Sequence, residues 1–170
     1  MPTSARPAAS ERIVSMEMES TQKRLLKGLL AGLVAGLVAT AVKSLAERIY
    51  PPRTHGEPEP TELLAEKLAG HALSAETEAV ASEAIHWGFG ALTGAAYGAL
   101  AEFYPAATSK EGASFGIALM TLTHEKALPA LGLSADPDHQ TLREQGSEAA
   151  THVLYGVVTE KVRGFVRKLL

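Results

Sequence analysis

The chain has 170 residues, of which 46% are hydrophobic and only 5% aromatic, and its formal net charge is −3. This length fits a single domain, and the slight acidic excess excludes the overall basic charge that is typical of nucleic-acid-binding domains. Because the chain contains no cysteine, disulfides, thiolate metal sites and iron–sulfur clusters are excluded as well.

The N-terminal part combines a polar leader with an apolar run. Residues 1–21 mix Pro, Ser, Ala and Glu without sustained periodicity, which predicts a disordered or loosely helical leader. Basic residues then precede an uncharged run at 28–42, and we expect a first membrane span over about 25–48. A secretory signal peptide is the alternative, because basic residues before a short apolar stretch are also typical of one. Three glycines in the run recur every four residues and would line one face of a helix; they are Gly28, Gly32 and Gly36.

Lys43 and Glu47 follow this run one helical turn apart, and both project onto the glycine face. Two interpretations stay open. The residues form a buried ion pair or proton-handling pair, or the lysine extends to the membrane surface while the glutamate lies in water. Prolines at positions 51 and 52 end the helix. The spacing of apolar residues over 61–73 then predicts a short amphipathic helix between the first two spans.

The longest uncharged stretch covers residues 85–101 and is almost long enough to cross a bilayer. We expect a second span over about 80–104, in a helix with Ser74 as its N-cap. His86 is expected to face the other helices, and Glu102 to point toward the membrane surface. This span repeats the four-residue glycine spacing, and the two glycine rows are expected to pack together; the second row is Gly90, Gly94 and Gly98.

Two further spans are expected over about 110–128 and 145–168. The third is short, and it crosses the bilayer only if its charged triplet, which begins at His124, faces other protein. The fourth carries Glu148 and His152 and ends in a basic cluster. Because basic residues concentrate before the first span and after the last, both termini are expected in the cytoplasm.

These elements predict an all-α fold: a four-helix transmembrane bundle with glycine-lined packing faces, formed by a single domain over 22–170. The glycine faces can be covered within one chain or can join two chains as a homo-oligomer. The mean hydropathy of +0.04 is low for a multi-pass membrane protein, although the polar leader and an acidic loop lower it. A soluble Ala- and Gly-rich helical protein is therefore the alternative.

Four groups of short motifs follow one another along the chain, one group with each expected span. They are Lys43, Ala46-Glu47 and Pro51-Pro52-Arg53; His86 and Ala101-Glu102-Phe103-Tyr104-Pro105; His124, Pro129 and Gly132-Leu133; and Ser147-Glu148 with His152. Over about residues 25–168 this order resembles the YagU-like family of small bacterial inner-membrane proteins, whose biochemical function is largely undefined. The charged Glu125-Lys126 pair departs from the family pattern. The resemblance implies an inner-membrane location and a link to acid tolerance, and it implies no catalytic residues.

Three of the expected spans each carry one histidine within an apolar segment, and such residues usually face the interior of a membrane protein. Together with three charged residues they form the predicted polar cluster. One hypothesis is a haem b or divalent-metal site that uses the histidines. A second is a pH-responsive relay of all six groups. A third is that the groups only form hydrogen bonds between helices. The six residues are Lys43, Glu47, His86, His124, Glu148 and His152.

The sequence contains no recognisable catalytic motif. It lacks a phosphate-binding glycine loop and a serine nucleophile elbow, and His124-Glu125 is not followed by the second histidine of a zinc protease. We therefore expect no enzyme and no small-molecule substrate, but a structural or interaction component whose partner is the lipid bilayer. His55, His71 and His139 lie in polar segments and are expected in solvent.

Overall fold

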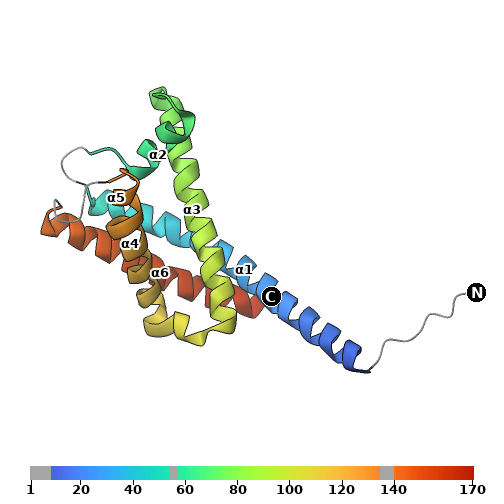
Figure 1. Ribbon diagram of the computed structural model, residues 1–170. Helices are drawn as coiled ribbons and strands as arrows, with labels where there is room; N and C mark the ends of the chain where they lie inside the picture. The colour runs from blue at the N-terminus through green and yellow to red at the C-terminus, as the bar shows by residue number, and fades with distance from the viewer. Residues whose placement is uncertain (1–8, 54–56, 135–139) are drawn as a thin grey trace, which may run out of the picture.

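The computed structural model describes residues 9–53, 57–134 and 140–170 (Figure 1). Every regular element in these three ranges is helical, which confirms the all-α class. The main helices are α1 (Ala9–Ile49), α2 (Pro60–Ala69), α3 (Ala75–Phe103), α4 (Ala113–Leu122) and α6 (Leu142–Leu169). Shorter helical pieces connect them: η1 (Pro105–Gly112), η2 (Thr123–Ala127) and α5 (Leu128–Ala130).

Local sequence signals account for where these helices begin and end. α1 ends at Ile49, just before two prolines that cannot continue a helix. Ser74 accepts a hydrogen bond from the backbone N–H of Thr77 and so caps α3, as the sequence predicts. Thr141 and Glu144 form a reciprocal capping box at the start of α6.

The longest helices lie against one another. α1 packs on both α3 and α6, α4 covers α6, and α2 packs on α3 (Figure 1). α1 and α6 run antiparallel, because Ser147 Oγ donates to the Tyr50 carbonyl oxygen at one end (2.6 Å) and Lys27 Nζ donates to the Leu170 carbonyl oxygen at the other (2.5 Å). The first and last helices therefore lie side by side from the start of α6 to its end.

The described part of the N-terminal leader is helical, which is the second of the two expected alternatives. Residues 9–21 form the first turns of α1, which project beyond the bundle in Figure 1; residues 1–8 lie outside the described ranges. The segment contains good helix formers such as Ala, Met and Glu. Glu19 and Lys23, one turn apart, add an ion pair of 2.5 Å. These local preferences favour a helix.

The third expected span also differs from the prediction, because it is not one regular helix over 110–128. α4 covers only Ala113–Leu122 and is followed by η2, a single turn of π-helix. Pro129 explains the change: it has no N–H to donate, and its ring would clash with the carbonyl four residues earlier in a regular helix. A wider turn accommodates it. Glu125 and Lys126 on this turn are exposed, whereas His124 points inward.

By length and composition, only α1 among the described helices supports a membrane location. Among the described residues, one helix is long and apolar enough to cross a bilayer: the segment Ser15–Ile49 of α1, whose most apolar window has a mean hydropathy of 2.0. The expected bundle of four spans is therefore not shown by length and composition. A buried core helix or a signal sequence can have the same properties.

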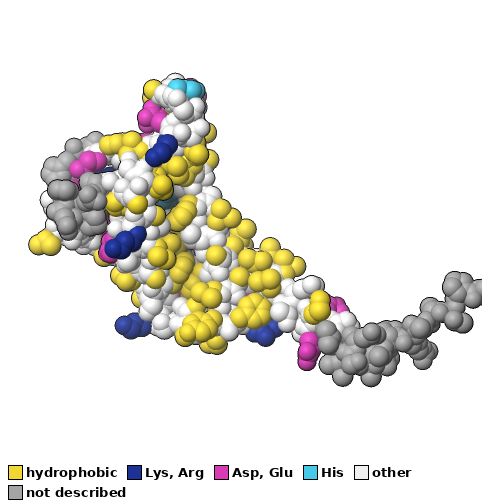
Figure 2. All heavy atoms as spheres, in the orientation of Figure 1, with side chains coloured by type: hydrophobic (Ala, Val, Ile, Leu, Met, Phe, Trp, Pro, Cys, Tyr) yellow, Lys and Arg dark blue, Asp and Glu magenta, His cyan; other side chains and the backbone are white. Residues whose placement is uncertain are grey.

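Small and polar residues, rather than large apolar ones, fill the interior. Ala31, Ala35 and Ala39 of α1 are fully buried, and so are Ser147 and Thr159 of α6. Many leucine, valine and phenylalanine side chains are instead exposed, and Figure 2 shows hydrophobic side chains over much of the face that it presents. Examples on three helices are Leu26, Leu30, Val38, Phe89, Leu92, Leu100, Ile117 and Leu122.

Candidate functional site: a buried polar centre

Two glycine rows bring α1 and α3 into backbone contact. A Cβ atom on Gly32 would lie 2.1 Å from the carbonyl oxygen of Gly94, and one on Gly36 would lie 2.2 Å from that of Gly90. A Cβ atom on Gly28 would similarly lie 2.7 Å from the Gly98 carbonyl oxygen. The two rows of the sequence analysis thus lie face to face within one chain, and this contact positions α3 on α1.

A second close contact joins α4 to α6, and sequence reasoning did not pair its residues. A Cβ atom on Gly116 would lie 2.1 Å from the carbonyl oxygen of His152, and one on Gly156 would lie 2.3 Å from that of Gly112. The four-residue spacing of Gly112 and Gly116 was the available signal. This contact holds the N-terminal part of α4, the helix that leads to His124, against α6.

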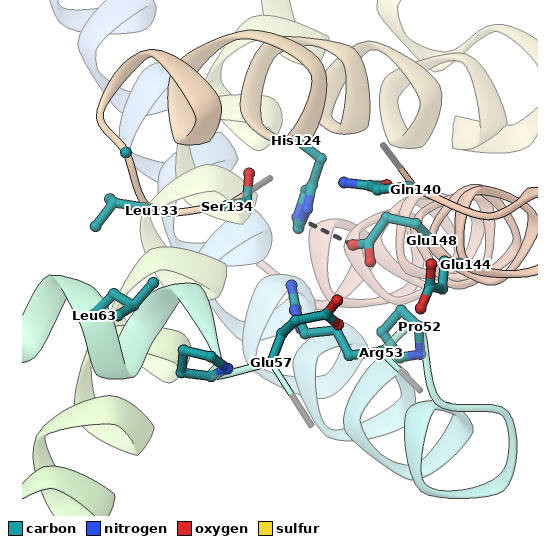
Figure 3. Close-up of a pocket in the computed structure, with 12 residues that line it drawn as sticks. Pro52, Arg53, Glu57, Leu63, His124, Leu133, Ser134, Gln140, Glu144 and Glu148 are labelled. Atoms are coloured by element: carbon teal, nitrogen blue, oxygen red, sulfur yellow. Dashed lines mark ion pairs between the residues drawn. The ribbon is translucent and has the colours of Figure 1, made fainter. Parts of the chain in front are cut away.

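Three residues from two segments converge where η2 meets α6. His124 Nε2 lies 3.1 Å from Glu148 Oε1, and Figure 3 shows its ring pointing at that carboxylate. His152 Nδ1 lies 3.4 Å from the same oxygen atom, and the two imidazole rings meet edge to face with centroids 4.8 Å apart. Each residue offers a ligand atom within 4.8 Å of the other two.

α1 contributes two charges to this cluster. The Lys43 ammonium forms a close ion pair with Glu47, one turn later on the same helix, and lies 3.9 Å from Glu148 Oε1. Lys43 is buried, so its ammonium faces the bundle rather than extending to an outer surface. We call the five residues Lys43, Glu47, His124, Glu148 and His152 the polar centre.

His86 does not join the other two histidines. Its Nε2 is hydrogen-bonded to Ser44 Oγ at 3.2 Å, across the contact between α3 and α1. The structure therefore links five of the six residues of the predicted polar cluster by direct contacts, whereas His86 contacts Ser44 and lines the same cavity as the other five. His71 is exposed, as expected, and His55 and His139 lie outside the described residues.

The protonation of one imidazole follows from its hydrogen bond. His152 Nδ1 lies 2.9 Å from the backbone carbonyl oxygen of Glu148. Since a carbonyl oxygen only accepts hydrogen bonds, Nδ1 carries the proton, and the lone pair of the neutral ring lies on Nε2. A backbone partner that fixes the tautomer in this way is typical of histidines that bind metal ions.

Two cavities meet at the polar centre. One of about 290 Å³ lies among α1, α3 and α4 and reaches His86, Tyr155 and the polar centre. The other, of about 210 Å³, opens toward the loops that follow α1 and α5, and Figure 3 shows Glu57, Ser134 and Glu144 around it. His124 and Glu148 line both cavities, so the centre forms the wall between them.

The opposite end of the bundle carries a second charged group. Glu102 accepts hydrogen bonds from Arg167 of α6, and Arg24 of α1 lies 3.9 Å from its other carboxylate oxygen. The Glu102 side chain is only 8% exposed, because long arginine side chains from two neighbouring helices reach it. It therefore faces the neighbouring helices, and the expectation that it lies toward a membrane surface stays a prediction.

The arrangement of the two imidazoles does not suit a haem. Two axial histidines are separated by a porphyrin and by two iron–nitrogen bonds of about 2 Å each, so their ring centroids lie roughly 6 Å apart. The rings of His124 and His152 are closer, at 4.8 Å, and meet edge to face. The donor set of two imidazoles and one carboxylate is instead one that can surround a single cation.

Comparison with known proteins places the chain in a family. Residues 37–161, which include the whole polar centre, match the family model described as "Protein of unknown function (DUF1440)". No curated protein and no solved structure matches the chain. Because the match covers well over half of its length, the protein belongs to the DUF1440 family.

Proposed function

We propose that the protein is an integral membrane protein of the bacterial inner membrane, with a structural or interaction role, whose helices form a bundle around the polar centre. The observation that carries this proposal is the inverted distribution of side chains. Among the described residues the fully buried positions belong to alanine, glycine, serine, threonine and tyrosine, and Lys43, Glu148 and His152 are buried with them. Many leucine, valine and phenylalanine side chains are instead exposed on α1, α3, α4 and α6.

This distribution is unfavourable in water and favourable in lipid. Exposed apolar surface costs about 25 cal/mol per Å² in water, and soluble proteins keep contiguous apolar patches small. In a bilayer the same surface contacts acyl chains, and helices associate through small residues and internal polar contacts. Ionisable groups inside membranes face the bundle and pair with one another, as Lys43, Glu47 and Glu148 do.

The two charged groups have a separation that suits a bilayer. Arg24 and Lys43 mark them on α1; these positions are nineteen residues apart, so the helix between them spans about 28 Å. The hydrocarbon core of a bilayer is about 30 Å thick. One group therefore fits each membrane surface, which supports α1 as a complete span.

The positions of the basic residues support four crossings. Arg24 and Lys27 of α1 meet Arg167 and the C-terminus of α6 at the same end of the bundle. Basic residues favour the cytoplasmic side, so we propose that both termini are cytoplasmic and that α3, the α4–α5 segment and α6 also cross the membrane. The two glycine rows cover each other within one chain, so the proposal needs no homo-oligomer.

The physiological part of the proposal rests on the resemblance to YagU-like inner-membrane proteins. That resemblance implies a contribution to acid tolerance. A strain that lacks the gene should survive mild acid less well than its parent, and expression of the protein should restore survival. Equal survival of the two strains would remove this part of the proposal and leave the membrane location untouched.

Membrane integration is tested with two matched leucine substitutions. Leu92 lies in the middle of α3 and is 70% exposed, whereas Leu142 lies at the start of α6, beyond the polar centre, and is 87% exposed. In a bilayer, Leu92→Arg places a charge among acyl chains, at a cost of about 2.5–3.5 kcal/mol. Leu142→Arg places its charge in the interfacial region or in water. In a soluble protein both changes are harmless surface substitutions.

We expect the unaltered protein to remain in the membrane fraction after alkaline carbonate extraction and to require detergent for release. Leu92→Arg should strongly reduce the amount of integrated protein, and Leu142→Arg should leave it near the level of the unaltered chain. Recovery of the unaltered protein in the soluble fraction, or equal behaviour of the two variants, would overturn the proposal.

A further inference from the structure

We propose that His124, Glu148 and His152 bind one divalent first-row transition metal ion, with Zn²⁺ as the representative ion. The inference is independent of the membrane location, because the same three residues would bind the ion in a soluble bundle. Two imidazoles and one carboxylate form the donor set of several zinc enzymes, in which the fourth position holds water or substrate.

One distance already fits a tetrahedral ion. With metal–ligand bonds of about 2.0–2.1 Å, neighbouring ligand atoms of a tetrahedral zinc site lie about 3.3 Å apart, and Glu148 Oε1 lies 3.1 Å from His124 Nε2. A ligand atom of each of the three residues lies within 4.8 Å of the other two. The side chains must therefore rotate, His152 above all, to bring their three donor atoms to a shared ion.

The carboxylate lacks the hydrogen bonds that a buried group normally has. Glu148 is 7% exposed, and its Oε1 atom accepts no hydrogen bond from the residues that the structure describes, although His124 Nε2 is in contact. Since an unsatisfied buried carboxylate oxygen costs free energy, a bound cation would stabilise the site.

The surrounding charges leave room for a cation. Lys43 forms its close ion pair with Glu47, and Arg53, which lines both cavities, pairs with Glu59 at 2.7 Å. Glu148 has Lys43 only at 3.9 Å. With neutral imidazoles, the polar centre contains one ammonium and two carboxylates. A divalent ion would change this net charge from −1 to +1, and Lys43 would keep Glu47 as its partner.

One of the three proposed metal-binding residues lies on an irregular helical turn. His124 lies on the π-helical turn η2, and single π turns inside helices are frequent at functional sites. The turn and the contact of Gly116 with the His152 backbone hold His124 over α6. The hydrogen bond from His152 Nδ1 to a backbone carbonyl leaves Nε2 of that ring as the donor to the ion.

An ion bound here would have both a route of entry and an open coordination position. The cavity of about 210 Å³ leads from the loops to His124 and Glu148 and carries Glu57 and Glu144 on its wall, so acidic groups line the way in. Three protein ligands leave a fourth position free. The cavity of about 290 Å³ borders the same residues and provides space for water or a small ligand at that position.

The donor types select the class of ion. Mg²⁺ and Ca²⁺ prefer six or more oxygen ligands, whereas imidazole nitrogen suits zinc, copper, nickel and iron. The full-length protein should be purified with a tag that contains no histidine, stripped with chelator and titrated with Zn²⁺. We expect one Zn²⁺ per chain by elemental analysis and no competition from excess Mg²⁺.

Three variants locate the site, and one histidine serves as a control. Glu148→Gln keeps the shape of the side chain but removes its charge, and we expect Zn²⁺ affinity to fall at least about a hundredfold, beyond the tenfold to hundredfold loss typical of supporting residues. His124→Ala and His152→Ala should have effects as large. His86→Ala is the matched control, because His86 lines the same cavity but is bonded to Ser44; it should bind Zn²⁺ like the unaltered protein.

Two outcomes would overturn the proposal. The first is an unaltered protein that binds no Zn²⁺. The second is a Glu148→Gln variant that keeps the full Zn²⁺ affinity, or a His86→Ala variant that loses it. Circular dichroism confirms that each variant is folded. If the three ligand variants fail to fold, Co²⁺ bound to the unaltered protein provides the test. A tetrahedral site with nitrogen and oxygen ligands should give strong visible absorption that one equivalent of Zn²⁺ abolishes, and a spectrum of hydrated Co²⁺ would reject the site.

Discussion

Gly32 on α1 lies against Gly94 on α3 so closely that a Cβ atom on Gly32 would come within 2.1 Å of the Gly94 carbonyl oxygen. The opposing group is backbone, which cannot rotate away as a side chain would. The contact therefore fixes the separation of α1 and α3. It also determines which residues of α3 face the cavity beside the polar centre.

We predict that Gly94→Ala destabilises the protein. Its Cβ atom would lie 2.5 Å from the Gly32 carbonyl oxygen, and a methyl group forced into a tightly packed contact typically costs about 1–3 kcal/mol. Gly88→Ala on the same helix is the control, because no atom lies within 4 Å of its added methyl group and alanine favours helix. Unfolding by SDS in mixed micelles, followed by circular dichroism, gives the comparison. Equal stability of the two variants would show that the helices are not in backbone contact.

A second prediction compares two lysine–glutamate pairs on α1 that share the same four-residue spacing. Lys23 and Glu19 are 69% and 64% exposed, whereas Lys43 and Glu47 are 11% and 20% exposed. Lys43→Met should destabilise the protein by on the order of 3 kcal/mol, because it leaves buried carboxylates without their cation. Lys23→Met should change stability little, since exposed pairs are screened by solvent.

The double variant Lys43→Met/Glu47→Gln tests the reason for this difference. Removing both charges of a buried pair costs less than removing one of them, so the double variant should be more stable than Lys43→Met alone. Additive losses in the same SDS titration would mean that the two side chains do not interact in the folded protein.

Local signals in the sequence predicted much of the fold. Prolines and N-caps mark helix ends through their own backbone chemistry, and the glycine spacing of four reveals which face of a helix allows close approach. These properties depend on neighbours in the chain. The same reasoning left residues 9–21 open between disorder and a loose helix, and their helix propensity agrees with the helix that forms.

Local sequence signals could not predict that the residues of the polar centre meet. Whether His124 meets Glu148 depends on the rotation of two helices about their axes and on the extra residue in the π turn η2, which changes the direction of every later side chain. A regular spacing of 100° per residue cannot anticipate that turn. For the same reason the sequence grouped His86 with His124 and His152, although the glycine contact directs His86 to Ser44.

A third prediction concerns the contact that supports His124. A Cβ atom on Gly116 would lie 2.1 Å from the backbone oxygen of His152, so Gly116→Ala should push α4 away from α6 and separate the two imidazoles. We expect lower stability and weaker Zn²⁺ binding. Gly164→Ala on α6 has no atom within 4 Å of its new methyl group and should alter neither property. A Gly116→Ala variant with unchanged stability would contradict the close contact, whatever the result for Zn²⁺.

The proposed orientation predicts a pattern of chemical labelling, and the absence of cysteine from the chain makes the experiment clean. Glu76 near the start of α3, Ser109 in η1 and Lys168 near the end of α6 are all exposed. Each of these residues is replaced singly by cysteine, and each variant is labelled in intact inner-membrane preparations. Glu76→Cys should react with a membrane-impermeant maleimide that is added on the outer side. Ser109→Cys and Lys168→Cys should react only after the membrane is permeabilised, since four crossings put both positions in the cytoplasm. Opposite labelling of Ser109→Cys and Lys168→Cys would mean an odd number of crossings between them.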